Sequence, residues 1–437
     1  MKHEIRTPVA IVGGGLAGLY AARRLHALGT GFQLFEARER LGGRILSTND
    51  QGQSSKDGFD LGPSWFWPEM QRGMAALVEE LGLATFPQQS DGDVVIERTS
   101  REEPRRYQGM PQEPQSMRVA GGTGALITAL SEKLPPEALR LGIRVTHATL
   151  TSSAVLLRVV APDGSEQDVA AEHVIFALPP RLLASSVTFT PDIDNATAIH
   201  WRNTATWMAP HAKFFALYEQ PFWREAGLSG TAQSQVGPLV EIHDATTASG
   251  MPALFGFLGV GADQRAAIGE DALTRACIEQ LTRLFGPDAG RPRATLLKDW
   301  AADPLTATAD DRSPGGHPEQ VKQQVGKIRA QHPARISCQR AAGAMRPGGV
   351  GGVVAIQRQR DIQRSGSQQY PARFAQYQEQ LAGRGIVAHV KHGRGQNLTR
   401  SIVLEKICSP ISPFMGLHVF SSGPLRGIQD KHVVLSR

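Results

Sequence analysis

A glycine-rich turn near the N-terminus constrains the fold of this chain more than any other feature of its sequence. Gly13, Gly15 and Gly18 have the spacing GxGxxG and lie between an apolar run, residues 8–12, and an amphipathic segment, residues 16–28. The apolar run is typical of a buried parallel strand, and the amphipathic spacing predicts a helix. A strand, a glycine turn and a helix in this order begin a βαβ unit that binds a dinucleotide.

The three glycines have different physical roles in such a turn. Gly13 permits the tight turn, Gly15 lets the backbone approach a pyrophosphate, and Gly18 lets the helix pack on the strand. The phosphates then lie at the helix N-terminus, where the helix dipole and free N–H groups favour negative charge. We therefore expect Leu16 and Ala17, the first helical residues, to take part in the phosphate site.

The next residues favour FAD over NAD. A second predicted strand, Phe32–Phe35, ends at Glu36, whose carboxylate is placed to accept hydrogen bonds from ribose hydroxyl groups. Gly42 and Gly43 then let the backbone approach a cofactor, and Arg44 can pair with its pyrophosphate. An NAD domain has no need of this second contact. The predicted contact region also includes Ala37 and Arg38.

Residues 36–44, with the sequence EARERLGGR, resemble the FAD-dependent amine oxidase superfamily, which includes monoamine and polyamine oxidases, L-amino-acid oxidases and, more distantly, phytoene desaturases. Residues 119–124 and 174–180 resemble family segments that lead into and out of the FAD domain. Residues 143–145 are similar to the strand whose backbone contacts adenine, at Val145 here. Residues 59–65 (FDLGPSW) look like the segment beside the flavin ring, which implies contacts from Gly62, Pro63, Ser64 and Trp65.

The resemblance also extends to a lysine. Residues 212–223 (AKFFALYEQPFW) look like the family strand that carries a lysine, which in relatives holds a water near flavin N5. A lysine in an otherwise apolar strand costs free energy unless it is solvated or paired, which favours a functional role for Lys213. A surface lysine whose stem packs on the strand is the alternative. Trp300 resembles the tryptophan before the last family segment, and a plain core role is its alternative.

Two other groups favour structural interpretations. His211 is two residues before Lys213 and could act as a base, but the sequence favours a structural histidine. Asp310 and Asp311 are adjacent, so their side chains are expected to point apart in a solvated turn.

The resemblance implies an oxidation in which a neutral amine or amino acid transfers a hydride from its α-carbon to flavin N5. The imine product would hydrolyse, and oxygen would reoxidise the flavin with release of hydrogen peroxide. Lys213 and its water would serve hydrolysis or reoxidation. No segment resembles a covalent attachment cysteine, so the FAD is expected to be non-covalent.

The predicted fold is α/β, with a Rossmann-like FAD/NAD(P)-binding domain and a second, α+β domain for the substrate. The FAD domain is expected to comprise residues 1–85 and 118–185, and the substrate domain residues 86–117 and 186–310. The periodicity predicts helices over residues 69–81, 125–134 and 265–285, a hairpin or excursion over 90–109, and a second sheet within 200–260.

Composition argues against several classes of protein. The chain is 41% hydrophobic and 20% charged, as in ordinary globular proteins, and no apolar run approaches the length of a membrane helix. Three scattered cysteines show no metal-binding or disulfide spacing, so no metal site is expected. The N-terminal residues lack the pattern of a signal peptide, which makes the cytoplasm the expected location.

The character of the chain changes near residue 311. Residues 312–437 contain 19 Lys and Arg against 5 Asp and Glu, and all six Trp lie before residue 301. The family's closing strand, glycine turn and helix cannot be found there. We interpret this basic tail, residues 311–437, as irregular or disordered and translated outside the ancestral reading frame. A nucleic-acid-binding arm is the alternative, but it explains only the charge.

The leading hypothesis is therefore an FAD-dependent amine or amino-acid oxidase, with a small-molecule substrate and oxygen as partners and without nucleic acid or membrane. An FAD-dependent desaturase or dehydrogenase is the second candidate. The third is a catalytically impaired copy without the C-terminal flavin-binding segment.

Overall fold

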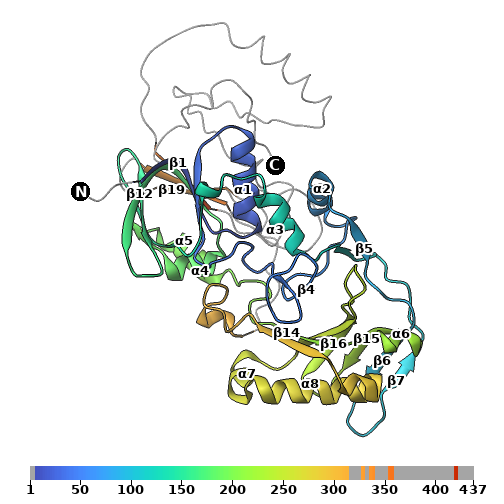
Figure 1. Ribbon diagram of the computed structural model, residues 1–437. Helices are drawn as coiled ribbons and strands as arrows, with labels where there is room; N and C mark the ends of the chain where they lie inside the picture. The colour runs from blue at the N-terminus through green and yellow to red at the C-terminus, as the bar shows by residue number, and fades with distance from the viewer. Residues whose placement is uncertain (1–4, 314–325, 330–333, 340–352, 359–417, 422–437) are drawn as a thin grey trace, which may run out of the picture.

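The computed structural model describes residues 5–313 and the backbone of four further segments, 326–329, 334–339, 353–358 and 418–421. Two large sheets with their helices make up most of the described chain (Figure 1). The first sheet carries the glycine turn and the second carries Lys213. None of the described helices is long and apolar enough to cross a membrane.

The first sheet is built around strand β1 (Ile5–Val12), which pairs in parallel with β2 (Phe32–Phe35) on one side and β12 (Glu166–Phe176) on the other. Helix α1 (Leu16–Ala27) connects β1 to β2, as the pattern of the sequence predicts. The short strand β9 (Leu139–Arg140) extends the sheet beyond β2, after the single turn η1 (Pro136–Ala138). This is the βαβ arrangement of a dinucleotide-binding domain.

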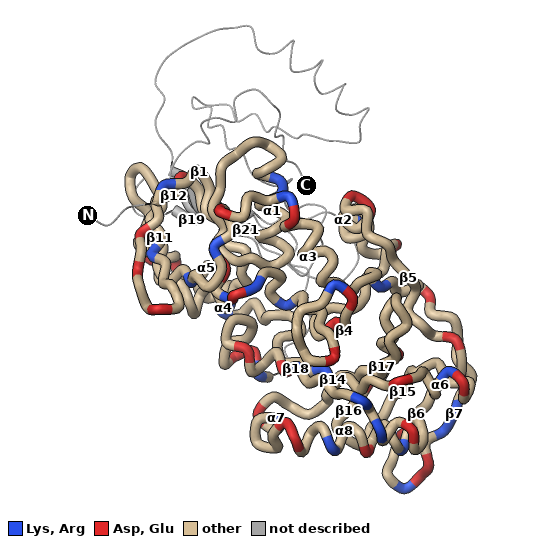
Figure 2. Tube along the Cα trace, viewed as in Figure 1, with Lys and Arg blue, Asp and Glu red and all other residues tan. Residues whose placement is uncertain are grey.

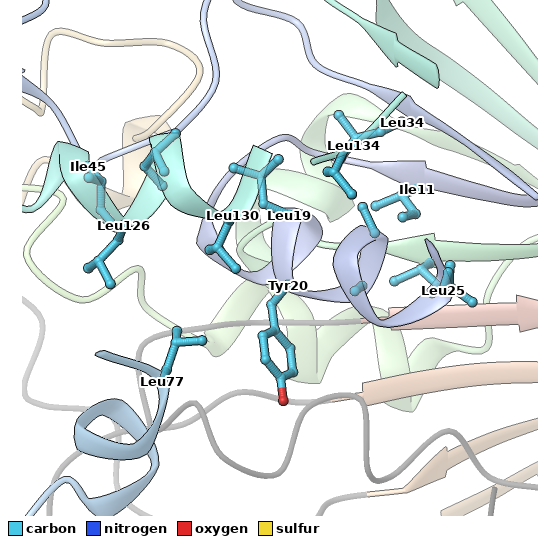
Figure 3. Close-up of a cluster of buried hydrophobic side chains, with 14 of the residues drawn as sticks. Ile11, Leu19, Tyr20, Leu25, Leu34, Ile45, Leu77, Leu126, Leu130 and Leu134 are labelled. Carbon is cyan, nitrogen blue, oxygen red and sulfur yellow. The ribbon is translucent and has the colours of Figure 1, made fainter. Parts of the chain in front are cut away.

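One face of this sheet is covered by α1 and α3 (Gly124–Ser131), with α2 (Arg72–Glu80) beside them. Apolar side chains from these elements form a common core, in which Leu19, Leu25 and Leu130 are almost fully buried (Figure 3). Helices α2 and α3 are both shorter than their apolar periodicity predicts. The structure therefore confirms the existence of these helices and corrects their ends.

The other part of the first sheet is antiparallel. Strand β10 (Arg144–Leu150) pairs with β11 (Val155–Val160), which pairs with β12. Strand β13 (Thr188–Thr190) is the exception, because it pairs in parallel with the edge of β10, and α4 (Pro180–Ser186) and α5 (Asn195–Asn203) share a core with it. Trp201 of α5 is buried in the core that these elements share.

Four strands of the basic tail also belong to the first sheet. Strand β22 (His418–Ser421) pairs with β12, and β21 (Val353–Arg358) pairs with β22. Strands β20 (Ala334–Gln339) and β19 (Gly326–Arg329) continue the sheet. Apart from these strands and residues 311–313, the tail lies outside the described residues, and so does most of the segment on which the hypothesis of a changed reading frame depends.

The second sheet has the strand order β18-β14-β17-β16-β15-β6-β7. The predicted hairpin is present as β6 (Asp93–Glu97) and β7 (Arg105–Tyr107), at the edge of this sheet. The first five strands of this order pair antiparallel with their neighbours: β18 (Ala294–Asp299), β14 (Ala212–Leu217), β17 (Ala253–Leu258), β16 (Leu239–Asp244) and β15 (Leu228–Ser234).

Helix α8 (Glu270–Phe285) covers one face of the second sheet, with Leu273, Leu281 and Leu284 in the shared core. The prediction of one helix over 265–285 is wrong, because the chain breaks into α7 (Ala262–Ile268) and α8 at Gly269. Gly269 has φ +83° and ψ 158°, a conformation that ends a helix and that only glycine adopts without strain.

Short elements join the two sheets. Strand β3 (Ser47–Thr48) pairs with β4 (Phe59–Asp60), and β5 (Thr85–Pro87) pairs with β8 (Met117–Val119). Helix α6 (Phe222–Glu225) and the single turns η2 (Pro287–Gly290) and η3 (Ala309–Asp311) complete the described elements. Basic and acidic residues are interspersed along both sheets (Figure 2).

Candidate functional site: a dinucleotide turn and a buried lysine

The glycine turn leaves space on the side where a phosphate is expected. Gly13 has φ +107°, and a Cβ atom placed on Gly18 would lie only 1.9 Å from the carbonyl oxygen of Gly13. A Cβ on Gly15, in contrast, would meet no atom within 4 Å. Gly15 is also the N-cap of α1, and no side chain caps this end of the helix. The N–H groups of the first turn, including those of Leu16 and Ala17, therefore have no capping side chain, and that turn contains no acidic residue.

A second glycine turn lies against the first. The Gly42 N–H donates to the carbonyl oxygen of Gly14 at 2.8 Å. Gly42 and Gly43 have φ values of +102° and +59°, and a Cβ on Gly43 would lie 3.4 Å from the Cα of Gly15. The two turns thus bring backbone close to the same place, which only residues without side chains allow.

Glu36 faces the first glycine turn. Its side chain is buried, and Oε2 accepts a hydrogen bond from the Gly14 N–H at 2.7 Å while Oε1 accepts from the Arg38 N–H at 2.9 Å. The Ile143 N–H donates to the Glu36 carbonyl oxygen, so the strand that contains Val145 begins beside Glu36. Val145 itself is buried, and its strand pairs it with Val159.

These features fit the diphosphate and ribose of a dinucleotide. An uncapped helix N-terminus, space over Gly15 and a carboxylate beside the turn supply donors for phosphate and acceptors for ribose hydroxyl groups. Glu36 is not turned away from the glycine turn, and among the described residues no side chain fills the space next to Gly15.

The Arg44 guanidinium makes a contact within the protein. The residue is partly buried, and the guanidinium donates to the carbonyl oxygen of Trp207 at 2.5 Å. Burial lowers the pKa of Arg44, while the Asp311 carboxylate opposes this effect. The backbone of Arg44 also lies against the predicted flavin segment, because a Cβ on Gly62 would be 1.9 Å from the Arg44 carbonyl oxygen.

Lys213 is buried against the predicted flavin segment. Only 5% of the residue is exposed, which rules out a surface lysine. Its Nζ donates to the carbonyl oxygen of Gly62 at 2.6 Å, to Ser64 Oγ at 2.8 Å and to the carbonyl oxygen of Asp60 at 3.2 Å. Burial lowers the pKa of Lys213 to about 7, and the Asp60 carboxylate opposes this shift. The three protein acceptors use all three N–H groups of the ammonium form.

Aromatic rings surround the lysine on its side of the second sheet. Its Nζ lies 4.6 Å from the centre of the Phe255 ring and 5.2 Å from that of Phe257. Trp65 packs on the same two rings, and its Nε1 donates to Gln88 Oε1 at 2.7 Å. A cation next to aromatic faces is stabilised by the ring quadrupoles, so this environment suits a cationic or amine group.

Trp300, the first residue after β18, contacts the same segment. Its indole Nε1 donates to the Leu61 carbonyl oxygen at 2.9 Å, and the side chain is buried. The structure therefore brings together Lys213, Trp300, Gly62, Ser64 and Trp65, and separately brings together the two glycine turns, Glu36 and Arg38. Pro63 lies in the same segment but is exposed.

Sequence reasoning missed several residues that contact these groups. Asp60 is buried, and its Oδ1 accepts hydrogen bonds from Ser47 Oγ, the Thr123 N–H and Thr123 Oγ1. Asp303 pairs with Arg38. Asp60 could have been noticed as a carboxylate within an apolar run, and Asp303 as one that follows Trp300 by three residues.

The prediction for Asp311 is wrong. Asp310 is exposed, but Asp311 is buried and accepts hydrogen bonds from Arg181 Nη1 at 2.6 Å and from the Thr206 N–H at 3.0 Å. The ion pair with Arg181 offsets the cost of burying the carboxylate. His211 is partly buried, with its ring edge toward Phe257. Within the described residues, no group of three His, Cys, Asp or Glu could hold a metal ion.

Comparisons with known proteins agree with this geometry. Residues 16–118 and 111–323 match the model of a family described as flavin containing amine oxidoreductase. A putative flavin-containing monoamine oxidase of Mycobacterium tuberculosis, AofH, is 27% identical over 410 residues, which cover 70% of this chain and 84% of the relative. A putrescine oxidase of Kocuria rosea is 39% identical over 94 residues, which cover 22% of this chain and 19% of that protein.

Solved structures show the same fold. A putrescine oxidase in complex with putrescine superposes with a TM-score of 0.60 at 22% identity, over 70% of this chain and 88% of that chain. The cyclohexylamine oxidase of Brevibacterium oxydans has a TM-score of 0.59 at 19% identity, over 69% of this chain and 86% of that chain.

Proposed function

Because the chain belongs to the flavin-containing amine oxidoreductases and its cofactor is FAD, we propose that it oxidises a small amine, with oxygen as the final electron acceptor. The FAD is proposed to be held without a covalent bond. The observation that carries this proposal is the buried Nζ of Lys213, which is held by Gly62 and Ser64 of the predicted flavin segment and surrounded by aromatic rings.

When bound, the flavin supplies the acceptor for the hydride that the α-carbon of the amine loses. The protein has to hold the amine next to that acceptor and manage its protons. A pKa near 7 allows Lys213 to take up or release a proton at neutral pH, as general acid–base catalysis requires. Loss of a proton leaves two N–H groups for three acceptors and a lone pair on Nζ, which can accept a hydrogen bond from a water.

Glu241 favours an amine over an amino acid as the substrate. The strand register places Phe257 opposite both Lys213 and Glu241, so the three side chains share one face of the second sheet. His243 Nε2 lies 2.7 Å from Glu241 Oε1, and this hydrogen bond lowers the pKa of Glu241. An ionised carboxylate on this face attracts an ammonium group and repels the carboxylate of an amino acid.

The visible absorption spectrum of the purified protein tests this function. A flavin band at about 450 nm is expected from FAD chemistry, and acid precipitation should release the flavin into the supernatant if it is not covalently bound. Primary amines and diamines added without oxygen should bleach the band, and oxygen should restore it with formation of hydrogen peroxide. Bleaching by polyenes but not by amines would instead indicate a desaturase, and bleaching by amino acids alone would contradict the role of Glu241.

A catalytically impaired copy, the third hypothesis from the sequence, is the other candidate that an observation favours. The family match ends at residue 323, close to the position where the composition of the chain changes. A colourless protein that does not bind added FAD would support this candidate and contradict the first. Sequencing of the coding DNA around codon 315 tests the changed reading frame directly, because a shifted frame should encode the family's closing glycine turn and helix.

A further inference from the structure

Asp303 forms a long-range contact with the predicted cofactor motif. It lies in the segment after β18, which turns back from the second sheet toward the first (Figure 1). Arg38 Nη2 donates to Asp303 Oδ1 at 3.0 Å, to Asp303 Oδ2 at 3.1 Å and to Thr306 Oγ1 at 2.9 Å. The Arg38 and Asp303 side chains are each only 14% exposed, so solvent screens this ion pair weakly.

Arg38 lies between two carboxylates. Its Nη1 is 3.7 Å from Glu36 Oε1, whereas its Nη2 is held by Asp303 and Thr306. A guanidinium free to rotate could pair bidentately with Glu36 and occupy both of its oxygens. The contacts of Nη2 with Asp303 prevent that arrangement. Burial acts to raise the pKa of Asp303, but Arg38 lowers it, with a net shift below the ordinary value, so Asp303 is ionised at neutral pH.

We propose that Asp303 is a positioning residue for the adenosine half of FAD: it holds Arg38 beside Glu36 and keeps the Glu36 carboxylate open to the ribose hydroxyl groups. This inference rests on FAD as the cofactor. Trp300, in the same short segment, donates to Leu61 of the predicted flavin segment. One segment that follows β18 therefore contacts both predicted halves of the cofactor site.

Two measurements test the proposal. FAD is titrated into the apoprotein and followed by flavin fluorescence, and the unfolding temperature of each apoprotein is measured. Asp303→Asn is expected to raise the Kd for FAD at least about tenfold, because a neutral amide holds the guanidinium more weakly. Asp303→Glu should restore part of the affinity. The matched control is Asp299→Asn, which breaks a comparable bidentate pair with Arg265 four residues earlier and should leave the Kd unchanged.

A double-mutant cycle separates positioning from simple stabilisation. If Asp303 acts through Arg38, Asp303→Asn should raise the Kd little further in an Arg38→Gln background. An unchanged Kd in Asp303→Asn, or the same fold increase in both backgrounds, would overturn the proposal while leaving the oxidase function intact. A wild-type apoprotein that does not bind FAD would overturn both.

Discussion

Gly15 and Gly18 belong to one turn, but a methyl group would meet different surroundings at each position. At Gly15 the backbone has an ordinary φ of −73° and a Cβ would enter open space. Gly15→Ala is therefore expected to leave the stability of the apoprotein unchanged and to raise the Kd for FAD at least about tenfold, since close approach of the backbone is lost.

Gly18→Ala is the matched comparison. Its Cβ would collide with the Gly13 carbonyl oxygen, so we expect a loss of about 1–3 kcal/mol in the free energy of unfolding, as for other overpacked sites. Urea unfolding and FAD titration of both variants check the pair. A destabilised Gly15→Ala protein with normal FAD affinity would contradict the assignment of the turn.

Lys213 makes the stability of the protein depend on pH. Its folded pKa of about 7 lies below the ordinary 10.5, so between these values the unfolded chain binds more protons than the folded protein. The free energy of unfolding should therefore rise with pH through this window. Lys213→Met removes this dependence. We therefore expect the free energy of unfolding of the wild type, relative to that of Lys213→Met, to rise by on the order of 4 kcal/mol between pH 7 and 10.5.

Denaturant unfolding at several pH values measures this effect. Lys56→Met, which replaces an exposed lysine, is the control and should follow the wild type. A constant difference between Lys213→Met and the wild type would show that Lys213 keeps an ordinary pKa. The same Lys213→Met protein should lose about two orders of magnitude in amine turnover if the lysine acts as an acid–base group.

At the level of elements, the register of β14 decides where Lys213 points. Successive side chains of a strand face opposite sides, so Ala212 and Phe214 pack under α8 whereas Lys213 and Phe215 face the predicted flavin segment. A shift of one residue would bury the lysine among the apolar side chains under α8. The pairing of β14 with β17 and β18 fixes the register and thereby the candidate site.

The break between α7 and α8 gives a prediction at the same level. Gly269→Ala is expected to lower the free energy of unfolding by about 1–3 kcal/mol, because alanine is strained at φ +83°. Gly261→Ala is the control, since its φ of −64° suits alanine and a Cβ there would meet only Gln264 Oε1 at 3.8 Å. Thermal unfolding of the two variants checks this prediction. Equal stabilities would show that alanine at position 269 is not strained.

For the whole molecule, Asp311 links the segment that follows the second sheet to helix α4, which packs on the first sheet. It pairs with Arg181 of α4 and accepts a hydrogen bond from the Thr206 N–H. Asp311→Ala leaves a largely buried guanidinium without its carboxylate, and we expect a loss of about 3 kcal/mol in stability. The exposed neighbour gives the control, because Asp310→Ala should change stability by less than about 0.5 kcal/mol. Similar losses of stability in both variants would contradict the role of the Asp311–Arg181 ion pair.

The division into an FAD domain and a substrate domain remains a prediction at this scale. The structure shows two large sheets, and it shows that residues 93–107 join the second sheet although the chain returns to the first sheet afterwards. The segment after residue 299 leaves the second sheet and contacts Leu61 through Trp300, Arg38 through Asp303 and Arg181 through Asp311.

The sequence by itself determined the parts of the site that depend on local spacing. A glycine turn between a strand and a helix, a carboxylate at the end of the next strand and a lysine within an apolar strand can each be identified within a few residues, because backbone conformation and burial are local properties. The sequence could not determine the end of α7, since Gly269 fits a helical pattern until its φ is known.

Only the tertiary structure decided which distant residues meet. Arg38 and Asp303 are 265 residues apart, and Lys213 is about 150 residues from the carbonyl groups of Asp60 and Gly62 that hold it. No local pattern specifies such a pair, because the attraction between the groups acts over a few ångströms of space and is independent of their separation along the chain. The same reason explains why Asp311 looked like a solvated turn residue and is a buried partner of Arg181.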